Sequence, residues 1–314
     1  MVRSMTRRSP IVVLAAAVLM GCASRSPAID RGTAAVRSAP LPASTLAKAE
    51  DRFFVAGDVR LRYREAGRGA PVVLLHGATR SLEDWVQIGD SLAVNYRVIT
   101  LDLRGHGQSS RFTERARFGS EMVDDVVRLL DHLHLQRAHL VGHSLGAVVA
   151  ANVATRYPTR VATVSFIAPP LYADWAAYMQ VYGAALAELE SGVGMARYNQ
   201  LIFPGISDSV ATAWSAAALA ATPAPTLAAV FGSMSALMIP PSAAAAVRGV
   251  PTLIAVGTGD PLLRQARWLA SWWPDARLLE LPGANHGTVM GQPELWTAVR
   301  QLMRARPTSA VPRE

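Results

Sequence analysis

Residues 140–147 read LVGHSLGA and place Ser144 between Gly142 and Gly146, in the pattern G-x-S-x-G. In some enzymes the serine of this pattern is a nucleophile. Five letters alone occur by chance in about one chain in ten of this length. A catalytic interpretation therefore depends on whether a strand ends just before Ser144 and a helix begins just after it.

The sequence on both sides of Ser144 has the periodicity of a strand followed by a helix. Residues 139–142 belong to a short apolar run that is typical of a strand buried on both faces. Residues 144–157 have helical spacing and end before Pro158. The flanking glycines fit a tight turn, because side chains in their place would collide with neighbouring backbone. Such a turn places the hydroxyl at the amino end of a helix, where N–H groups stabilise a developing negative charge.

The rest of the chain alternates predicted strands with predicted helices, which indicates βαβ units and a mostly parallel sheet. The strands are expected at residues 53–55, 59–63, 72–75, 97–101, 139–142, 161–167, 252–256 and 277–281, and the helices at 81–93, 121–133, 144–157, 262–273 and 293–303.

Residues 169–248 interrupt this alternation. They are rich in alanine, mostly helical in character, and carry the aromatic residues Tyr172, Trp175, Tyr178, Tyr182, Phe203, Trp214 and Phe231. The segment is therefore expected to be a folded insertion rather than a linker. Its aromatic residues either pack between helices or contact a substrate, and the sequence leaves both roles open.

A serine nucleophile needs a base, and the base needs a carboxylate that orients it. Of the seven histidines, His286 lies in GANHG, just after the last predicted strand, and Asp260 lies in GTGDP, just after the preceding one. Loops at the carboxyl ends of parallel strands line the active crevice of open α/β sheets. Asp174 is the alternative carboxylate, and Asp260 has the alternative role of a helix cap before Pro261.

Taken together, these motifs resemble the α/β-hydrolase family, in which the order Ser, Asp, His is expected. The chain also carries LLHGATRSLEDW at 74–85 and LDLRGHGQS at 101–109, and the resemblance extends from about residue 53 to residue 303. It implies an α/β fold with a mostly parallel eight-stranded sheet flanked by helices. A helical cap is expected as an insertion after the sixth strand.

The resemblance also implies the roles of individual residues. Ser144 would be the nucleophile, His286 the general base and acid, and Asp260 the orienting carboxylate. The backbone N–H groups of Ala78 and Leu145 would form the oxyanion hole. Three other polar residues of the motifs are expected to brace loops by hydrogen bonding instead: Asp102, His76 and His106. Trp268, Trp272 and Trp273 have helical spacing and are expected to be packing residues.

The expected reaction is hydrolysis of carboxylic esters of small, mostly apolar molecules through an acyl-enzyme on Ser144. No metal and no cofactor are expected, since the chain has no Cys/His cluster and no dinucleotide or P-loop glycine pattern. A serine in place of an aspartate argues against relatives that open epoxides or displace halide. The alternatives are C–C bond hydrolysis, amide hydrolysis, perhydrolase chemistry, and a non-catalytic binding lipoprotein of the envelope.

The amino-terminal sequence has the pattern of an export signal. Arg3, Arg7 and Arg8 precede an apolar run at residues 11–20, which is too short to span a bilayer. The run ends in LMGC, which resembles the lipobox of bacterial lipoproteins, with Cys22 as the lipidated residue and the only cysteine of the chain. An ordinary cleaved signal and an uncleaved anchor are the alternatives. The expectation is a lipid-anchored envelope protein, on the periplasmic side of the outer membrane if the cell is Gram-negative.

The expected division of the chain follows from these segments. It comprises a signal peptide at 1–21, a flexible tether at 22–50, a catalytic core at 51–168 and 249–308, a helical cap at 169–248 and a tail at 309–314. With 51% hydrophobic and 17% charged residues, the chain has enough apolar residues for a large core. The net charge of +8 comes from scattered arginines without a nucleic-acid-binding motif, so no nucleic-acid partner is expected.

Overall fold

Eight strands form one sheet in the computed structural model, which describes residues 46–306 and residue 308. The sheet order is β1-β2-β4-β3-β5-β6-β7-β8; β2 is antiparallel to both neighbours and all other pairs are parallel. The strands are β1 (Arg52–Ala56), β2 (Val59–Ala66), β3 (Ala70–Leu75), β4 (Tyr96–Leu101), β5 (Ala138–His143), β6 (Val161–Ile167), β7 (Thr252–Gly257) and β8 (Ala276–Leu281). The expected α/β-hydrolase fold with a mostly parallel eight-stranded sheet is confirmed.

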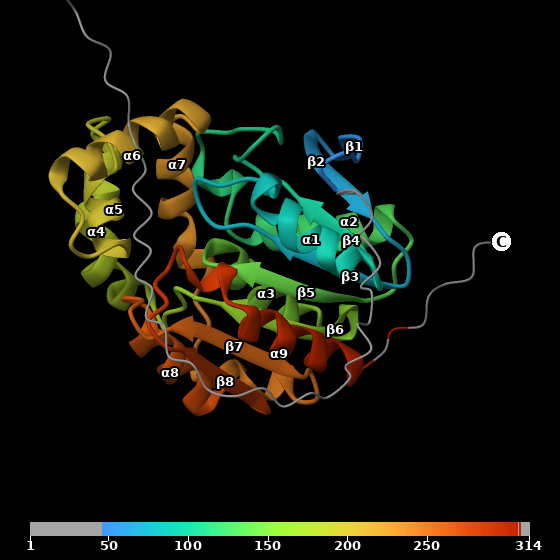
Figure 1. The fold of residues 1–314 in the computed structure, drawn as a ribbon. Helices are drawn as coiled ribbons and strands as arrows, with labels where there is room; N and C mark the ends of the chain where they lie inside the picture. Colours follow the sequence, from blue (N-terminus) through green and yellow to red (C-terminus); the bar gives the residue numbers. More distant parts are fainter. Residues whose placement is uncertain (1–45, 307, 309–314) are drawn as a thin grey trace, which may run out of the picture. The chain divides into compact units, whose positions relative to one another are not determined.

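Helices cover both faces of the sheet because the central strands are apolar at successive positions. In β3, Val72 and Leu74 belong to one apolar cluster, which includes residues of α1 and α9, and Val73 and Leu75 belong to a second, which includes residues of α2, α3 and α8. Successive side chains of a strand point to opposite faces, so a strand buried on both faces needs no polar position. The covering helices are α1 (Val86–Ala93), α2 (Ser120–His132), α3 (Leu145–Arg156), α8 (Leu263–Trp272) and α9 (Pro293–Arg304) (Figure 1).

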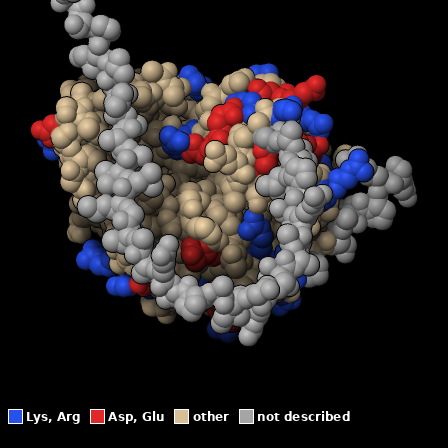
Figure 2. All heavy atoms as spheres, in the orientation of Figure 1, with Lys and Arg blue, Asp and Glu red and all other residues tan. Residues whose placement is uncertain are grey.

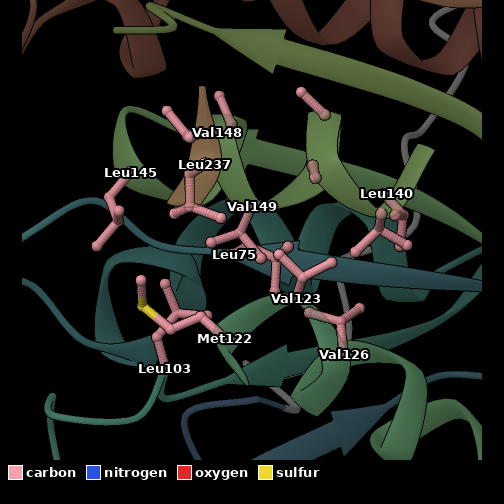
Figure 3. Close-up of a cluster of buried hydrophobic side chains, with 14 of the residues drawn as sticks. Leu75, Leu103, Met122, Val123, Val126, Leu140, Leu145, Val148, Val149 and Leu237 are labelled. Carbon is pink, nitrogen blue, oxygen red and sulfur yellow. The ribbon is translucent and has the colours of Figure 1, made fainter. Parts of the chain in front are cut away.

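The helix α3, which follows Ser144, is buried from residue 145 to residue 154. Val148 and Val149 of this helix belong to one apolar cluster with Leu75 and Leu140 of the sheet and with Leu237 (Figure 3). Each such buried aliphatic side chain contributes roughly 1.5–3 kcal/mol. In addition, Asn152 Nδ2 donates a hydrogen bond to the Leu237 carbonyl at 3.1 Å. The helix that begins at the candidate nucleophile is therefore firmly packed.

The segment between β6 and β7 contains the helices α4 (Trp175–Glu190), α5 (Ala196–Ile202), α6 (Asp208–Ala221) and α7 (Ala224–Gly232). Asp174 caps α4, since its side chain accepts the Ala177 N–H at 2.9 Å, and Ser207 caps α6 in the same way. On the visible surface in Figure 2, charged side chains gather near β1 and β2, whereas the cap helices carry few of them.

The membrane-spanning potential of the described helices is limited. Within residues 46–306 and 308, no single helix is long and apolar enough to cross a membrane. The helices α6 and α7 reach the required length and composition only as a pair, and the chain bends by 94° between them.

Two local expectations need correction. Residues 82–85 form a 3₁₀ turn before α1, instead of the first turn of one α-helix, and the Leu82 N–H donates to Asp102. The expected tether does not reach residue 50, because Leu46 is 1% exposed and packs in the core where Gly89 has no side chain. The signal peptide, Cys22 and most of the tether, as well as the tail at 309–314, lie outside the described residues.

Candidate active site

The candidate residues follow strands that end at the same edge of the sheet. Leu75 at the end of β3 pairs with Gly142 in β5, and His143 at the end of β5 pairs with Ile167 in β6. The parallel register of β7 and β8 continues this edge. The loops after β3, β5, β7 and β8 therefore meet, although their sequences lie up to about 200 residues apart in the chain.

Ser144 occupies a strained turn between β5 and α3. Its φ of 52° and ψ of −117° lie in a region that non-glycine residues rarely adopt, at a cost of about 1–3 kcal/mol. A Cβ at Gly142 would collide with the Gly146 carbonyl, and a Cβ at Gly146 would collide with the Leu75 carbonyl. The two glycines are therefore required by close backbone approach, which is the reason inferred from the sequence.

His286 and Asp260 form a buried pair. The distance from His286 Nδ1 to Asp260 Oδ2 is 3.0 Å, and the other carboxylate oxygen accepts the Leu262 N–H at 2.8 Å. An ionised carboxylate only accepts hydrogen bonds, so Nδ1 carries the proton and Nε2 keeps its lone pair. This is the tautomer that a general base for a serine hydroxyl needs.

The loops that carry these two residues are tied together by backbone contacts. The Gly259 N–H donates to the Ala284 carbonyl at 2.9 Å, and the Gly283 N–H donates to Thr258 Oγ1 at 2.9 Å. A Cβ at Gly257 would collide with the Ala284 carbonyl, so this close approach needs glycine. The motifs GTGDP and GANHG thus form one structural unit.

The alternative carboxylate, Asp174, has a different position. Its side chain accepts the Ala177 N–H and caps α4. Among the described residues, the carboxylate that bonds the His286 ring is that of Asp260.

The backbone N–H groups of Ala78 and Leu145 are available as donors. In the described part of the chain, no hydrogen bond uses the Ala78 N–H, and Leu145 is the first residue of α3, where an N–H has no acceptor within the helix. The loop that carries Ala78 lies against Ser144, since a Cβ at Gly77 would be 3.3 Å from the Ser144 Cβ.

The other polar residues of the family motifs brace loops, as expected. Asp102 Oδ1 accepts the Leu82 N–H at 2.7 Å and Oδ2 accepts the Gln108 N–H at 2.9 Å. His76 Nε2 accepts the Leu103 N–H at 3.0 Å, and burial lowers the pKa of His76. Burial also lowers the pKa of His106 to about 3.

The three tryptophans expected to be packing residues do pack. Trp273 belongs to the core, and Trp268 and Trp272 lie against it.

His143, the variable residue of the G-x-S-x-G pattern, has a structural role that the sequence did not indicate. Its Nε2 donates to the His286 carbonyl at 3.2 Å, and the two ring centroids are 4.9 Å apart. Burial lowers the pKa of His143 to about 3, so the ring stays neutral near neutral pH. It supports the His286 loop from the strand that carries Ser144.

A cavity of about 690 Å³ contains both Ser144 and His286 in its wall. Its remaining lining comes from the segment after β3, from the end of β5, from cap helices α5 and α6 and the residue after α5, and from the His286 loop. These residues are His76, Gly77, Ala78, Thr79, Arg80, Asp84, Trp85, His143, Tyr198, Asn199, Ile202, Phe203, Trp214, Ala217, Ala218, Ala221, Gly287 and Met290.

A smaller recess of about 20 Å³ also touches Ser144. It is lined by Ala78, Ser144, Leu145, Pro170, Tyr178, Tyr182, Tyr198, Val230, Phe231 and Met234. Several cap aromatics therefore line cavities, while Tyr172 and Trp175 pack against other rings. Tyr198 lines both cavities, and the sequence offered no signal that singled it out.

No metal site emerges from the described residues, since no group of three or more His, Cys, Asp or Glu side chains is placed to hold an ion.

Comparison with known proteins assigns the family. Residues 70–293 match the family described as alpha/beta hydrolase fold. Over 278 residues, the chain is 28% identical to a 2-hydroxymuconate semialdehyde hydrolase from Pseudomonas sp. (strain CF600). The alignment covers 81% of this chain and 90% of that protein. A solved esterase structure from Thermogutta terrifontis aligns with a TM-score of 0.66 and 25% identity, over 83% of this chain and 100% of that one.

A shorter match is more similar. Over 110 residues, the chain is 46% identical to the dihydrolipoyllysine-residue acetyltransferase component of an acetoin cleaving system from Pseudomonas putida. This match covers 34% of the present chain but only 30% of that protein's length. The family, the semialdehyde hydrolase and the esterase structure support hydrolase activity in general, and the chain belongs to the α/β-hydrolase fold family.

Proposed function

We propose that the protein is a serine hydrolase that cleaves carboxylic esters of small, mostly apolar molecules through an acyl-enzyme on Ser144. The observation that carries this proposal is the buried His286–Asp260 pair, whose histidine lines the same cavity as a serine held in a strained strand–helix turn. A serine hydroxyl, an oriented imidazole and two available N–H donors are the groups that acyl transfer needs.

The mechanism follows from these groups. His286 Nε2 takes the Ser144 proton as the serine oxygen attacks the ester carbonyl, and the carbonyl electron pair moves onto oxygen. The N–H groups of Ala78 and Leu145 stabilise that negative charge. The imidazolium then protonates the departing alkoxide, which leaves an ester on Ser144. Water, deprotonated by the same imidazole, attacks this ester, and the imidazolium returns that proton to the Ser144 oxygen as the acid leaves.

The cavity supports a small substrate. Its volume of about 690 Å³ is within the range of sites for small molecules, roughly 300–1,000 Å³. Apolar side chains of the cap, among them Phe203, Trp214 and Ala218, form part of its wall. An ion pair of Arg80 and Asp84, in the segment after β3, also lines this cavity, with 2.7 Å between Nε and Oδ2.

C–C bond hydrolysis is the second candidate, because a relative that aligns over most of both chains is named 2-hydroxymuconate semialdehyde hydrolase. Against this candidate, HGATRSLEDW lacks the Gly-Pro-rich loop that C–C hydrolases often carry after their His-Gly.

A substrate panel distinguishes the two candidates. The purified full-length protein is assayed with p-nitrophenyl esters of increasing acyl length, a p-nitroanilide and a dienol diketone. Ester hydrolysis that exceeds cleavage of the other two substrates is the expected result. Faster cleavage of the diketone would replace the ester proposal with the C–C proposal.

We also propose that the protein is anchored in the cell envelope by a lipid on Cys22. The proposal is supported by the arginines and the apolar run that precede this cysteine and by the sequence LMGC, which ends in it. Multiple acyl chains would hold the protein stably at a membrane. The test is cell fractionation of Cys22→Ser beside Ser24→Ala as the control. The cysteine variant should leave the membrane fraction, and unchanged membrane association of both variants would contradict lipidation.

A further inference from the structure

A tyrosine of the cap reaches the candidate nucleophile. Tyr198 lies on α5, and its hydroxyl lies close enough to that of Ser144 for the two groups to interact. Tyr198 and Ser144 both line the 690 Å³ cavity and the 20 Å³ recess. The insertion therefore brings a side-chain hydroxyl to the reacting oxygen of the core.

The recess has the size and position of an oxyanion site. Its volume of about 20 Å³ is close to that of one water-sized atom. Ala78 and Leu145, whose N–H groups are the proposed donors, both line it, and Leu145 is not among the residues of the larger cavity. The carbonyl oxygen of a bound ester would therefore enter the recess, while the rest of the substrate occupies the larger cavity.

The recess also holds a second tyrosine whose hydrogen bonding is incomplete. Tyr178 is 1% exposed, and its hydroxyl has no hydrogen-bond partner among the described residues. Buried polar groups nearly always have a partner. An oxygen atom in a recess lined by these side chains would therefore enter a polar environment rather than a purely apolar one.

The ring of Tyr198 is held by its aromatic neighbours. Its centroid is 5.0 Å from that of Phe231 and 6.3 Å from that of Tyr182, both of which line the recess. Burial raises the pKa of Tyr198, so its hydroxyl stays protonated and remains able to donate. Tyr172 belongs to the same group of rings, but its hydroxyl accepts from Gln265 Nε2 at 3.3 Å and lies at neither cavity.

We propose that Tyr198 is a third donor of the oxyanion hole, supplied by the cap. The inference rests on the proposed acyl transfer at Ser144. When the Ser144 oxygen bonds to the substrate carbon, the carbonyl electron pair moves onto oxygen, and the Tyr198 O–H donates to that oxygen in place of Ser144. The phenol keeps its proton throughout, so no other proton acceptor is needed. Catalysis then requires that the cap is packed on the core, because α5 of the cap carries Tyr198.

The first test compares Tyr198→Phe with Tyr172→Phe, which removes a hydroxyl from the same aromatic group away from the cavities. Loss of one oxyanion donor lowers kcat on the order of 100-fold. We expect this loss for Tyr198→Phe with little change in KM, and values close to wild type for Tyr172→Phe. An unchanged kcat in Tyr198→Phe would overturn the inference.

The second test separates an oxyanion donor from a packing residue. An arylboronic acid forms a tetrahedral adduct with a serine nucleophile and places a hydroxyl in the oxyanion site. Its inhibition constant should weaken in Tyr198→Phe by about the same factor as kcat/KM falls, while the melting temperature stays near that of Tyr172→Phe. A fall in kcat/KM without weaker boronate binding would overturn the inference.

Boronate binding also distinguishes a failure of the proposed function from a failure of this inference. If the wild type hydrolyses no ester but binds the boronate more tightly than Tyr198→Phe, the substrate proposal fails and the role of Tyr198 stands. Equal affinity of the two proteins, or no binding by either, overturns the role of Tyr198.

Discussion

Asp260 fixes both the orientation and the proton of His286: Oδ2 lies 3.0 Å from Nδ1, and Oδ1 is itself held by the Leu262 N–H. The carboxylate is therefore a fixed acceptor at Nδ1, and in the proposed mechanism Nε2 is the atom that takes the Ser144 proton. The same loop is bonded to the His286 loop through Gly259 and Ala284. We therefore expect activity to depend on this carboxylate, because it holds the proton of His286 on Nδ1.

Asp260→Asn should lower kcat by about 10³–10⁴-fold, because an amide can donate to Nδ1 and stabilise the wrong tautomer. Asp174→Asn is the matched control, since asparagine also caps helices and Asp174 serves α4. Steady-state kinetics of both variants check the assignment. Normal turnover in Asp260→Asn, or an equal loss in Asp174→Asn, would refute it.

Gly146→Ala should destabilise the fold by roughly 3 kcal/mol, because the new Cβ collides with the Leu75 carbonyl and the backbone cannot move away cheaply. Gly291→Ala is the control, because a Cβ there has no atom within 4 Å. Thermal unfolding followed by circular dichroism measures both. Equal melting temperatures would show that the turn has room for a side chain.

Stability should decrease as the pH falls below about 6.5. Burial lowers the pKa of His106 and His143 to about 3 and that of His139 to about 4, from 6.5. Below pH 6.5 the unfolded chain binds protons that the folded chain does not. Each histidine therefore lowers the free energy of unfolding by about 1.4 kcal/mol per pH unit until the pH reaches its pKa in the folded protein. The stabilisation is complete above pH 6.5 and lost towards pH 3–4.

The measurement is the free energy of unfolding in urea between pH 7 and pH 4.5. His139→Gln should reduce the slope by about one proton. A stability that is constant across this pH range would show that these histidines are protonated in the folded protein.

The sheet and the placement of the candidate residues were predictable because they depend on local signals. Apolar runs mark most of the strands, and Ser144, Asp260 and His286 each lie within five residues after the end of a strand. Since parallel strands end at a common edge, order along the chain suffices to bring such residues together. The requirement for glycine at 142 and 146 is also local, because it arises within a turn of a few residues.

Other features were not predictable because they depend on packing between distant segments. Tyr198 meets Ser144 only through the docking of α5, and nothing in its neighbours' sequence marks it. His143 supports His286 across 143 positions of the chain. Leu46 is an apolar residue in a stretch without periodicity, so the local sequence does not indicate that it is buried. It packs where Gly89 has no side chain, because a Cβ at Gly89 would collide with Leu46.

The role of Ser144 is tested most directly by the hydrolysis of p-nitrophenyl acetate by the wild-type protein and by Ser144→Ala. We expect turnover by the wild type, a loss of at least about 10³-fold in the variant, and matching circular dichroism spectra. A fluorophosphonate should label Ser144 in the wild type alone. Hydrolysis at the wild-type rate by a folded Ser144→Ala protein would contradict the central claim.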